Sequence, residues 1–360
     1  MTMLASSGLS RSSFFSWVKI CSLKLRFATM VGVLVSTCLI LVDYTGTAMA
    51  APTAEELLKA LPLSDGERKD VLEGEIVRFT TEEGSDRELA LGAVLLVKNV
   101  PKNLPQLWRE AVVFKLVGAV TAFGEISDKA TVGDFAGVKL QPNGEKEAKR
   151  YLEAEPGDTL NLDAKEISDF QALKAKGGSH AEVETLVREQ LLARYHAYRE
   201  NGLSGITPYV RGKEKMFELS QDLLLATNEA KLVAKYFPTF HQTLLTYPTS
   251  EAKQLETRFY WANVDVFSRP TLILSHRLLF NEGDAYVVAD RHFYASHEYN
   301  GLQSVGGAFP AQEGSLLVAL YRISTDGVAG FGSSAKHPVA RGLMGPYFEE
   351  MFEGIRKKAE

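Results

Sequence analysis

Cysteine is nearly absent from this chain of 360 residues, and its placement excludes several kinds of chemistry. Cys21 and Cys38 are the only two cysteines, and both precede residue 51. The rest of the chain therefore has no thiol for a disulfide, a thiolate metal site or a cysteine nucleophile. Positive charge is also in deficit, because 40 Lys and Arg residues face 45 Asp and Glu residues. That balance argues against a nucleic-acid partner, which needs a basic surface.

Long hydrophobic runs are scarce, and the clearest one lies near the N-terminus. Residues 27–42 are almost wholly apolar, and the small residues Ala48-Met49-Ala50 follow them. This order, with basic residues in front, is typical of a secretory signal peptide. The run is also shorter than the roughly 20 residues that span a bilayer comfortably. We therefore predict that residues 1–50 are a signal peptide cleaved after Ala50. The mature protein is then periplasmic or secreted, with no stable membrane span. The basic residues are Arg11, Lys19, Lys24 and Arg26.

Recognisable catalytic motifs are missing as well. No G-x-S-x-G sequence marks a nucleophilic serine, and the glycines of residues 327–332 do not follow the phosphate-binding pattern. His276, His292 and His297 cluster in sequence with acidic neighbours. A hairpin closed at Glu282-Gly283, however, places His276 and His292 on opposite faces of a sheet. The sequence therefore predicts no catalytic residue, no metal site and no cofactor.

Hydrophobic periodicity divides the mature chain into two regions. Residues 51–144 and 263–360 have the strand character of an antiparallel sheet, and residues 145–262 have the character of a mainly helical insertion. Capping boxes at Ser64, Asp163 and Ser179 each predict the start of a helix. Predicted strands cover residues 75–81, 88–100, 111–127, 134–140, 271–280, 285–294 and 315–323. Within the insertion, helices are expected over 213–227, 229–236, 239–246 and 250–262.

The last predicted helix covers residues 338–357 and has an apolar stripe on one face. Leu343, Tyr347, Met351 and Ile355 recur at helical spacing. We expect these side chains to be buried against the sheet of residues 271–280, 285–294 and 315–323. Arg356, Lys357 and Lys358 should then face solvent. The overall prediction is an α+β fold, in which a long C-terminal helix covers a curved antiparallel sheet.

Two segments give the chain a resemblance to a known family. The segment Val97 to Trp108 reads as a strand that ends in proline and enters a short helix bearing an aromatic residue. The second segment is the run of late strands followed by the C-terminal helix. Together these elements resemble the helix-grip fold of START-like and polyketide-cyclase-like ligand-binding proteins. The resemblance implies an apolar cavity between the sheet and the C-terminal helix.

Aromatic side chains are the best candidates for lining such a cavity. Tyrosine suits this role because it combines an apolar body with a polar tip. The sequence therefore favours a binding protein over an enzyme, with an apolar small molecule or lipid as its ligand. Two alternatives stay open: a hydrolase or metal enzyme using His276 or His297 with Glu298, and an envelope scaffold or assembly factor that binds a protein through its helical region. The candidate ligand-binding residues are His276, Tyr286, Phe293, Tyr294, Tyr321, Tyr347 and Met351.

Overall fold

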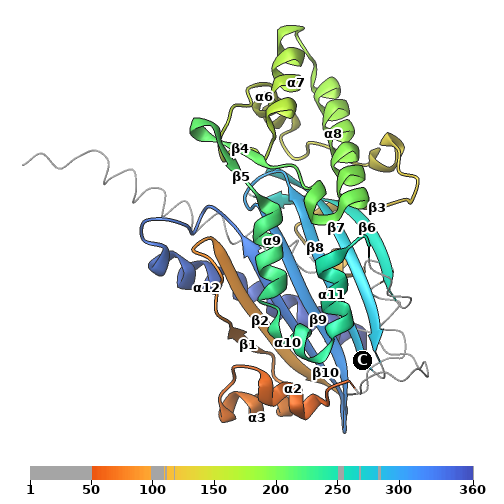
Figure 1. Cartoon of the computed structure of the whole chain (residues 1–360), viewed down its shortest axis with the longest axis vertical. Helices are drawn as coiled ribbons and strands as arrows, with labels where there is room; N and C mark the ends of the chain where they lie inside the picture. Colours follow the sequence, from red (N-terminus) through yellow and green to blue (C-terminus); the bar gives the residue numbers. More distant parts are fainter. Residues whose placement is uncertain are drawn as a thin grey trace, which may run out of the picture.

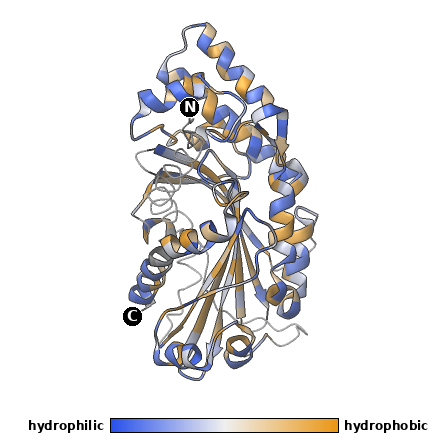
Figure 2. Cartoon of the chain, turned by 90° about the vertical axis from the view of Figure 1, so that its left-hand side faces the viewer, coloured by the Kyte–Doolittle hydropathy of each residue, from blue (hydrophilic) through white to orange (hydrophobic). Residues whose placement is uncertain are grey.

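An antiparallel sheet of eight strands runs through the molecule, with helices on both of its faces (Figures 1 and 2). The computed structural model describes residues 51–98, 109, 112–116, 118–249, 255–266, 269–282 and 285–359. The predicted signal peptide and the predicted proline-and-aromatic helix after Val97 lie outside these ranges. The α+β class and the large antiparallel sheet are confirmed.

The sheet has the strand order β1-β2-β10-β9-β8-β7-β6-β3, and every neighbouring pair is antiparallel. Strands β6 to β10 follow one another in both sequence and space, so they form a meander. Strands β4 and β5 form a separate small hairpin. The bounds are β1 (Val77–Thr80), β2 (Glu88–Val97), β3 (Val120–Ile126), β4 (Tyr209–Arg211), β5 (Lys215–Phe217), β6 (Glu256–Val266), β7 (Arg269–Glu282), β8 (Ala285–Ala295), β9 (Gly301–Ala311) and β10 (Gly314–Ser324).

Helices connect and cover the strands, and capping boxes begin α3, α7 and α8 as the sequence predicts. The α-helices are α2 (Ala54–Ala60), α3 (Asp65–Glu73), α5 (Val112–Leu116), α6 (Gly144–Leu152), α7 (Ala164–Ala175), α8 (His180–Asn201), α9 (Leu219–Asn228), α10 (Lys231–Tyr236), α11 (Pro238–Thr246) and α12 (Ser333–Ala359). Three short 3₁₀ turns are η2 (Val132–Phe135), η3 (Gly202–Gly205) and η4 (Gly212–Glu214).

Helix α12 covers one face of the sheet, as the apolar stripe predicts (Figure 2). The short helix α5 packs against α12 in the same core. Met351 and Ile355 are buried, and Leu343 is half-buried against the same core. Lys357 and Lys358 are exposed as predicted, but Arg356 is half-buried and donates from Nη1 to the carbonyl oxygen of Gly74 at 3.0 Å. Among the strands, α12 contacts mainly β2. The side chain of Tyr347 is not among those that the structure describes. Apolar side chains of α12 and of the sheet belong to one buried core.

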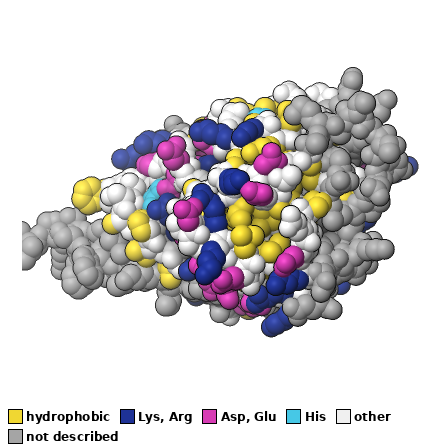
Figure 3. All heavy atoms as spheres, turned by 90° about the horizontal axis from the view of Figure 1, so that it is seen from below, with side chains coloured by type: hydrophobic (Ala, Val, Ile, Leu, Met, Phe, Trp, Pro, Cys, Tyr) yellow, Lys and Arg dark blue, Asp and Glu magenta, His cyan; other side chains and the backbone are white. Residues whose placement is uncertain are grey.

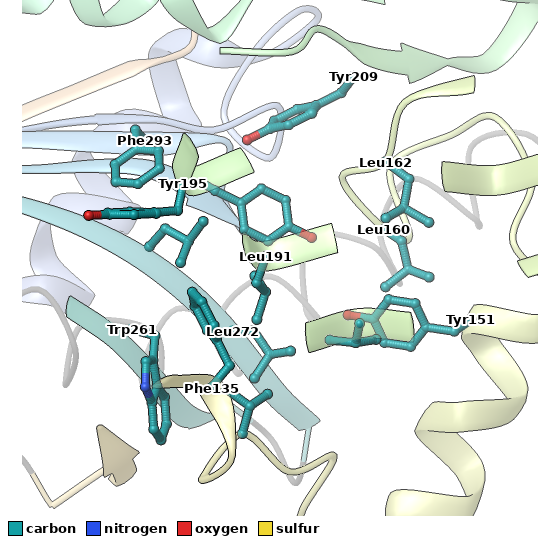
Figure 4. Packing of buried hydrophobic residues seen from close by; sticks show 14 of the residues in the cluster. Phe135, Tyr151, Leu160, Leu162, Leu191, Tyr195, Tyr209, Trp261, Leu272 and Phe293 are labelled. Carbon is teal, nitrogen blue, oxygen red and sulfur yellow. The ribbon is translucent and has the colours of Figure 1, made fainter. Parts of the chain in front are cut away.

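Two groups of helices cover the opposite face of the sheet. Helices α2, α10 and α11 pack over one end of β8, β9 and β10 and form an apolar core there. Helices α6, α7 and α8 pack over the other end, where Trp261, Leu272 and Phe293 meet Leu191 and Tyr195 of α8 (Figure 4). The sheet is thus buried on both faces, which explains why its strands read as continuous apolar runs.

Burial on both faces also accounts for one wrong prediction. The helix predicted over residues 250–262 is wrong from Glu256 onward, because β6 pairs with β7 along its whole length. Phe259 and Trp261 pack on one face of β6 and Tyr260 on the other, which produces a run without clear periodicity. The helical middle region therefore ends before residue 256.

Several other helices and strands begin or end at residues that differ from the prediction. The strand predicted over 111–127 is divided into α5 and β3, and the strand predicted over 134–140 is a 3₁₀ turn followed by irregular chain. The helix predicted over 213–227 begins at Leu219, after β5. Strand β9 was not predicted, because its glycines weaken the strand pattern. A hairpin closed at Glu282-Gly283 would pair His276 with Ala289, but in the β7–β8 hairpin His276 pairs with Arg291.

Candidate functional site

A pocket of about 390 Å³ opens between the sheet and the helices that cover its second face. Its walls come from α2, β1 and α10, and they include Leu57, Leu61 and Phe79. Strands β9 and β10 supply the floor, with Val305 and Leu320. Seen from below, hydrophobic side chains gather in a patch that charged side chains border (Figure 3). The size and the mainly apolar lining are those of a small-molecule site.

Strand alternation builds the floor of this pocket. Val318 and Leu320 are two residues apart on β10, so they project from the same face of the sheet. Val305 of β9 pairs with Leu320 and projects beside it. Val318 and Leu320 are only half-buried, because the short helices α2 and α10 do not close over them. The result is an apolar part of the sheet that remains accessible.

A glycine in β2 shapes one wall. Gly92 pairs with Leu320, and the ring of Phe79 lies directly over it. A Cβ atom at position 92 would be 2.3 Å from Cζ of Phe79, so only glycine permits this packing. Phe79 therefore lies flat on the sheet and lines the pocket.

One end of the pocket is polar, and Arg322 defines it. This side chain projects from β10 on the same face as Leu320 and is buried. Its Nη1 donates to Glu88 at 2.8 Å, and its Nη2 donates to Thr81 Oγ1 and to the carbonyl oxygens of Glu82 and Glu229 at 3.2–3.3 Å. Its Nε is buried and has no hydrogen-bond partner in the described part of the chain. Arg322 thus forms the polar end of the pocket. Its charge is paired with Glu88, and its buried Nε–H group has no partner among the described residues.

The rim of the polar end has further charged groups. Lys231 pairs with Glu229 at 2.9 Å. Glu82 lines the pocket and is exposed. Basic and acidic groups are therefore both present, and most of them are already paired.

The residues that the sequence singled out for ligand binding lie elsewhere. Among the residues that the structure describes, none of them lines the pocket. Tyr286, Tyr321 and Met351 belong to the core under α12, where the Tyr321 hydroxyl contacts Sδ of Met351 at 3.4 Å. Phe293 stacks on Tyr198 of α8. Tyr294 packs under the guanidinium of Arg194, 4.4 Å from its ring centre. These aromatic side chains serve core packing.

The three histidines occupy separate places. His276 Nδ1 lies 3.0 Å from the Tyr198 hydroxyl, and its Nε2 lies 2.8 Å from the Thr257 hydroxyl. His292 Nδ1 lies 2.7 Å from the Tyr299 hydroxyl. His297 contacts Thr271 and the carbonyl oxygen of Pro270. His276 and His292 project from opposite faces, as predicted. Within the described ranges, no group of three metal-ligating side chains comes together.

Burial changes the protonation of two of these histidines. It lowers the pKa of His292 to about 4 and holds the pKa of His276 well below its ordinary range. The charge of Arg291, next to His276, lowers the pKa of His276 further. Both rings are therefore neutral near pH 7, and neither is accessible to a substrate.

A second polar cluster is buried on the α12 face of the sheet. Asp290 accepts a hydrogen bond from Arg277 Nε at 2.8 Å and one from Ser275 Oγ at 2.5 Å. The guanidinium of Arg277 lies between the rings of Phe114 and Tyr260. The Ser275 hydroxyl donates to the carboxylate and not to His292, although His292 pairs with Ser275 across the strands. This geometry is not that of a serine nucleophile with its base.

The pocket residues were missed for a physical reason. Residues 75–81 were predicted as a strand, but nothing in their pattern indicates that they lie beside β9 and β10 in the wall of a pocket. The usable signal was the alternation of Val318, Leu320 and Arg322, which places one charged side chain at the end of an apolar row.

Comparison of the chain with protein-family models, with curated proteins and with solved structures gave no match. Within the described ranges, no helix combines the length and the apolar character that crossing a membrane requires.

Proposed function

We propose that this protein binds an apolar small molecule or the hydrocarbon part of a lipid in the pocket between α2, α10 and the sheet. The observation that supports this most directly is an apolar cavity of about 390 Å³ over Val318 and Leu320. Apolar side chains on central strands are normally covered, and an accessible group of them marks a binding site. We further propose that residues 1–50 export the chain, so that binding takes place outside the cytoplasm.

The size of the pocket sets the expected affinity. Burial of about ten methylene groups contributes roughly 8 kcal/mol of gross binding free energy. Loss of translational and rotational freedom offsets a large part of that gain. Because about 8 kcal/mol corresponds to a dissociation constant near 1 μM, binding should be micromolar or weaker for a ligand of that size.

The test is titration with N-phenyl-1-naphthylamine, an uncharged dye that fluoresces in apolar surroundings. The variant Leu320→Trp fills the pocket from its floor, where Leu320 is half-buried. The matched control is Met216→Trp, since Met216 is 53% exposed on β5 and does not line the pocket. We expect saturable binding by the wild type and by the control, and at least tenfold weaker binding by Leu320→Trp. Equal binding by all three proteins would rule out this pocket.

A further inference from the structure

The polar end of the pocket indicates what kind of head group its ligand has. We propose that this ligand is an uncharged amphiphile, with a hydroxyl or ester head of the kind found in a long-chain alcohol or a monoacylglycerol, and not a free fatty acid. This inference rests on the proposed function, because it concerns the same pocket. It follows from the state of Arg322 and from the charges around it.

Arg322 is not available to a ligand carboxylate. Its side chain is 5% exposed, and the Glu88 side chain that it pairs with is 6% exposed. Glu88 also accepts from the backbone N–H of Gly84 at 2.5 Å, which holds the carboxylate in place. A ligand carboxylate would have to displace Glu88 and leave it buried without its cation. Breaking a buried ion pair in this way is strongly unfavourable.

The remaining guanidinium donors limit the ligand further. Nη2 of Arg322 is shared among three neutral oxygen atoms of Thr81, Glu82 and Glu229. Nε is left without a partner among the described residues. A single N–H group cannot form the two parallel hydrogen bonds that recognise a carboxylate or phosphate. Because Nε is itself buried, a carboxylate cannot reach it without displacing groups that Arg322 already contacts. A hydroxyl or ester head group needs no charged partner, so it loses less than a carboxylate does at this end of the pocket.

The charged groups at the rim of the pocket also favour an uncharged head group. Lys231 is neutralised by Glu229, and Arg322 by Glu88. Glu82 has no ion pair within the described ranges, so it adds a negative charge at the pocket. An anionic head group is therefore repelled. A cationic head group would gain little, because an ion pair with an exposed carboxylate contributes little binding free energy.

The experiment is displacement of N-phenyl-1-naphthylamine at pH 7.5 by four compounds with the same alkyl chain: an alcohol, a monoacylglycerol, a carboxylate and an amine. The two uncharged compounds should bind at least about tenfold more tightly than the carboxylate. The variant Glu88→Gln keeps the shape of the side chain and frees the charge of Arg322. It should tighten carboxylate binding and leave alcohol binding nearly unchanged.

A second variant is needed because Glu88 is buried and Glu88→Gln could misfold. Glu82→Gln removes the exposed charge and should tighten carboxylate binding by a smaller factor than Glu88→Gln. The inference is overturned if the carboxylate or the amine binds best to the wild type, and the proposed pocket then still stands. If the dye and all four compounds fail to bind, the proposed function fails, and the inference fails with it.

Discussion

Acidification should destabilise this protein well above the pH at which its carboxylates titrate, because buried His292 must stay neutral in the fold. Burial lowers the pKa of His292 from its ordinary value of 6.5 to about 4. Between these two values the unfolded chain takes up a proton on His292 and the folded chain does not. The stability that the neutral ring contributes is therefore fully present above pH 6.5. It is lost progressively as the pH falls to about 4.

The magnitude follows from the size of the shift. Each pKa unit corresponds to 1.36 kcal/mol, so a shift from 6.5 to about 4 costs roughly 3 kcal/mol of the free energy of unfolding. His276 acts in the same direction, since burial lowers its pKa too. Carboxylates such as Asp134, whose pKa is lowered to about 2, act at lower pH. In the window from pH 5 to 6.5, which lies above the range in which Asp134 titrates, comparison with a His292 variant therefore isolates the contribution of His292.

The assay is urea unfolding at a series of pH values in that window, for the wild type and for His292→Asn. Each buried neutral histidine contributes up to about 1.4 kcal/mol per pH unit to the slope of the unfolding free energy against pH. The variant should lose one such contribution, whatever its absolute stability. Equal slopes for the two proteins, or an NMR titration of folded His292 near pH 6.5, would refute the reasoning.

Three further predictions concern stability and processing. Arg277→Met should lower the free energy of unfolding by about 3–5 kcal/mol in urea unfolding, because buried Asp290 loses its cation. The double variant Arg277→Met/Asp290→Asn should lose clearly less stability than the single variant, and equal losses would contradict this account. Truncation at Gly342 removes the part of α12 that buries Met351 and Ile355, and it should give insoluble or unfolded protein. A truncated protein with an unchanged melting temperature would show that α12 is dispensable. N-terminal sequencing of the exported protein should begin at Ala51; a mature chain that retains residues 1–50 would disprove cleavage.

Elements with a local signal were predictable from the sequence. Capping boxes gave the starts of α3, α7 and α8, and the apolar stripe gave α12 and the burial of Met351. These signals lie within a few residues of each other, so they do not depend on the rest of the fold. The same holds for the opposite faces of His276 and His292, which follow from strand geometry.

Features that depend on distant packing were not predictable. Strand β6 is covered on both faces, so its apolar residues have no period that separates strand from helix. The pocket forms where α2, β1, α10 and β10 pack together, and the sequence did not predict the packing of these distant elements. The resemblance implied a cavity under α12, whereas the pocket described here lies on the opposite face of the sheet.

Native mass spectrometry tests the central claim most directly. The wild type, Leu320→Trp and Met216→Trp would be purified without detergent from the same cells that express the full chain. The account predicts a non-covalently bound apolar molecule on the wild type and on Met216→Trp, and its loss from Leu320→Trp. A bound molecule that Leu320→Trp retains in full would contradict the assignment of this pocket. A wild type that is free of ligand and takes up neither added monoacylglycerol nor N-phenyl-1-naphthylamine would contradict the binding function itself.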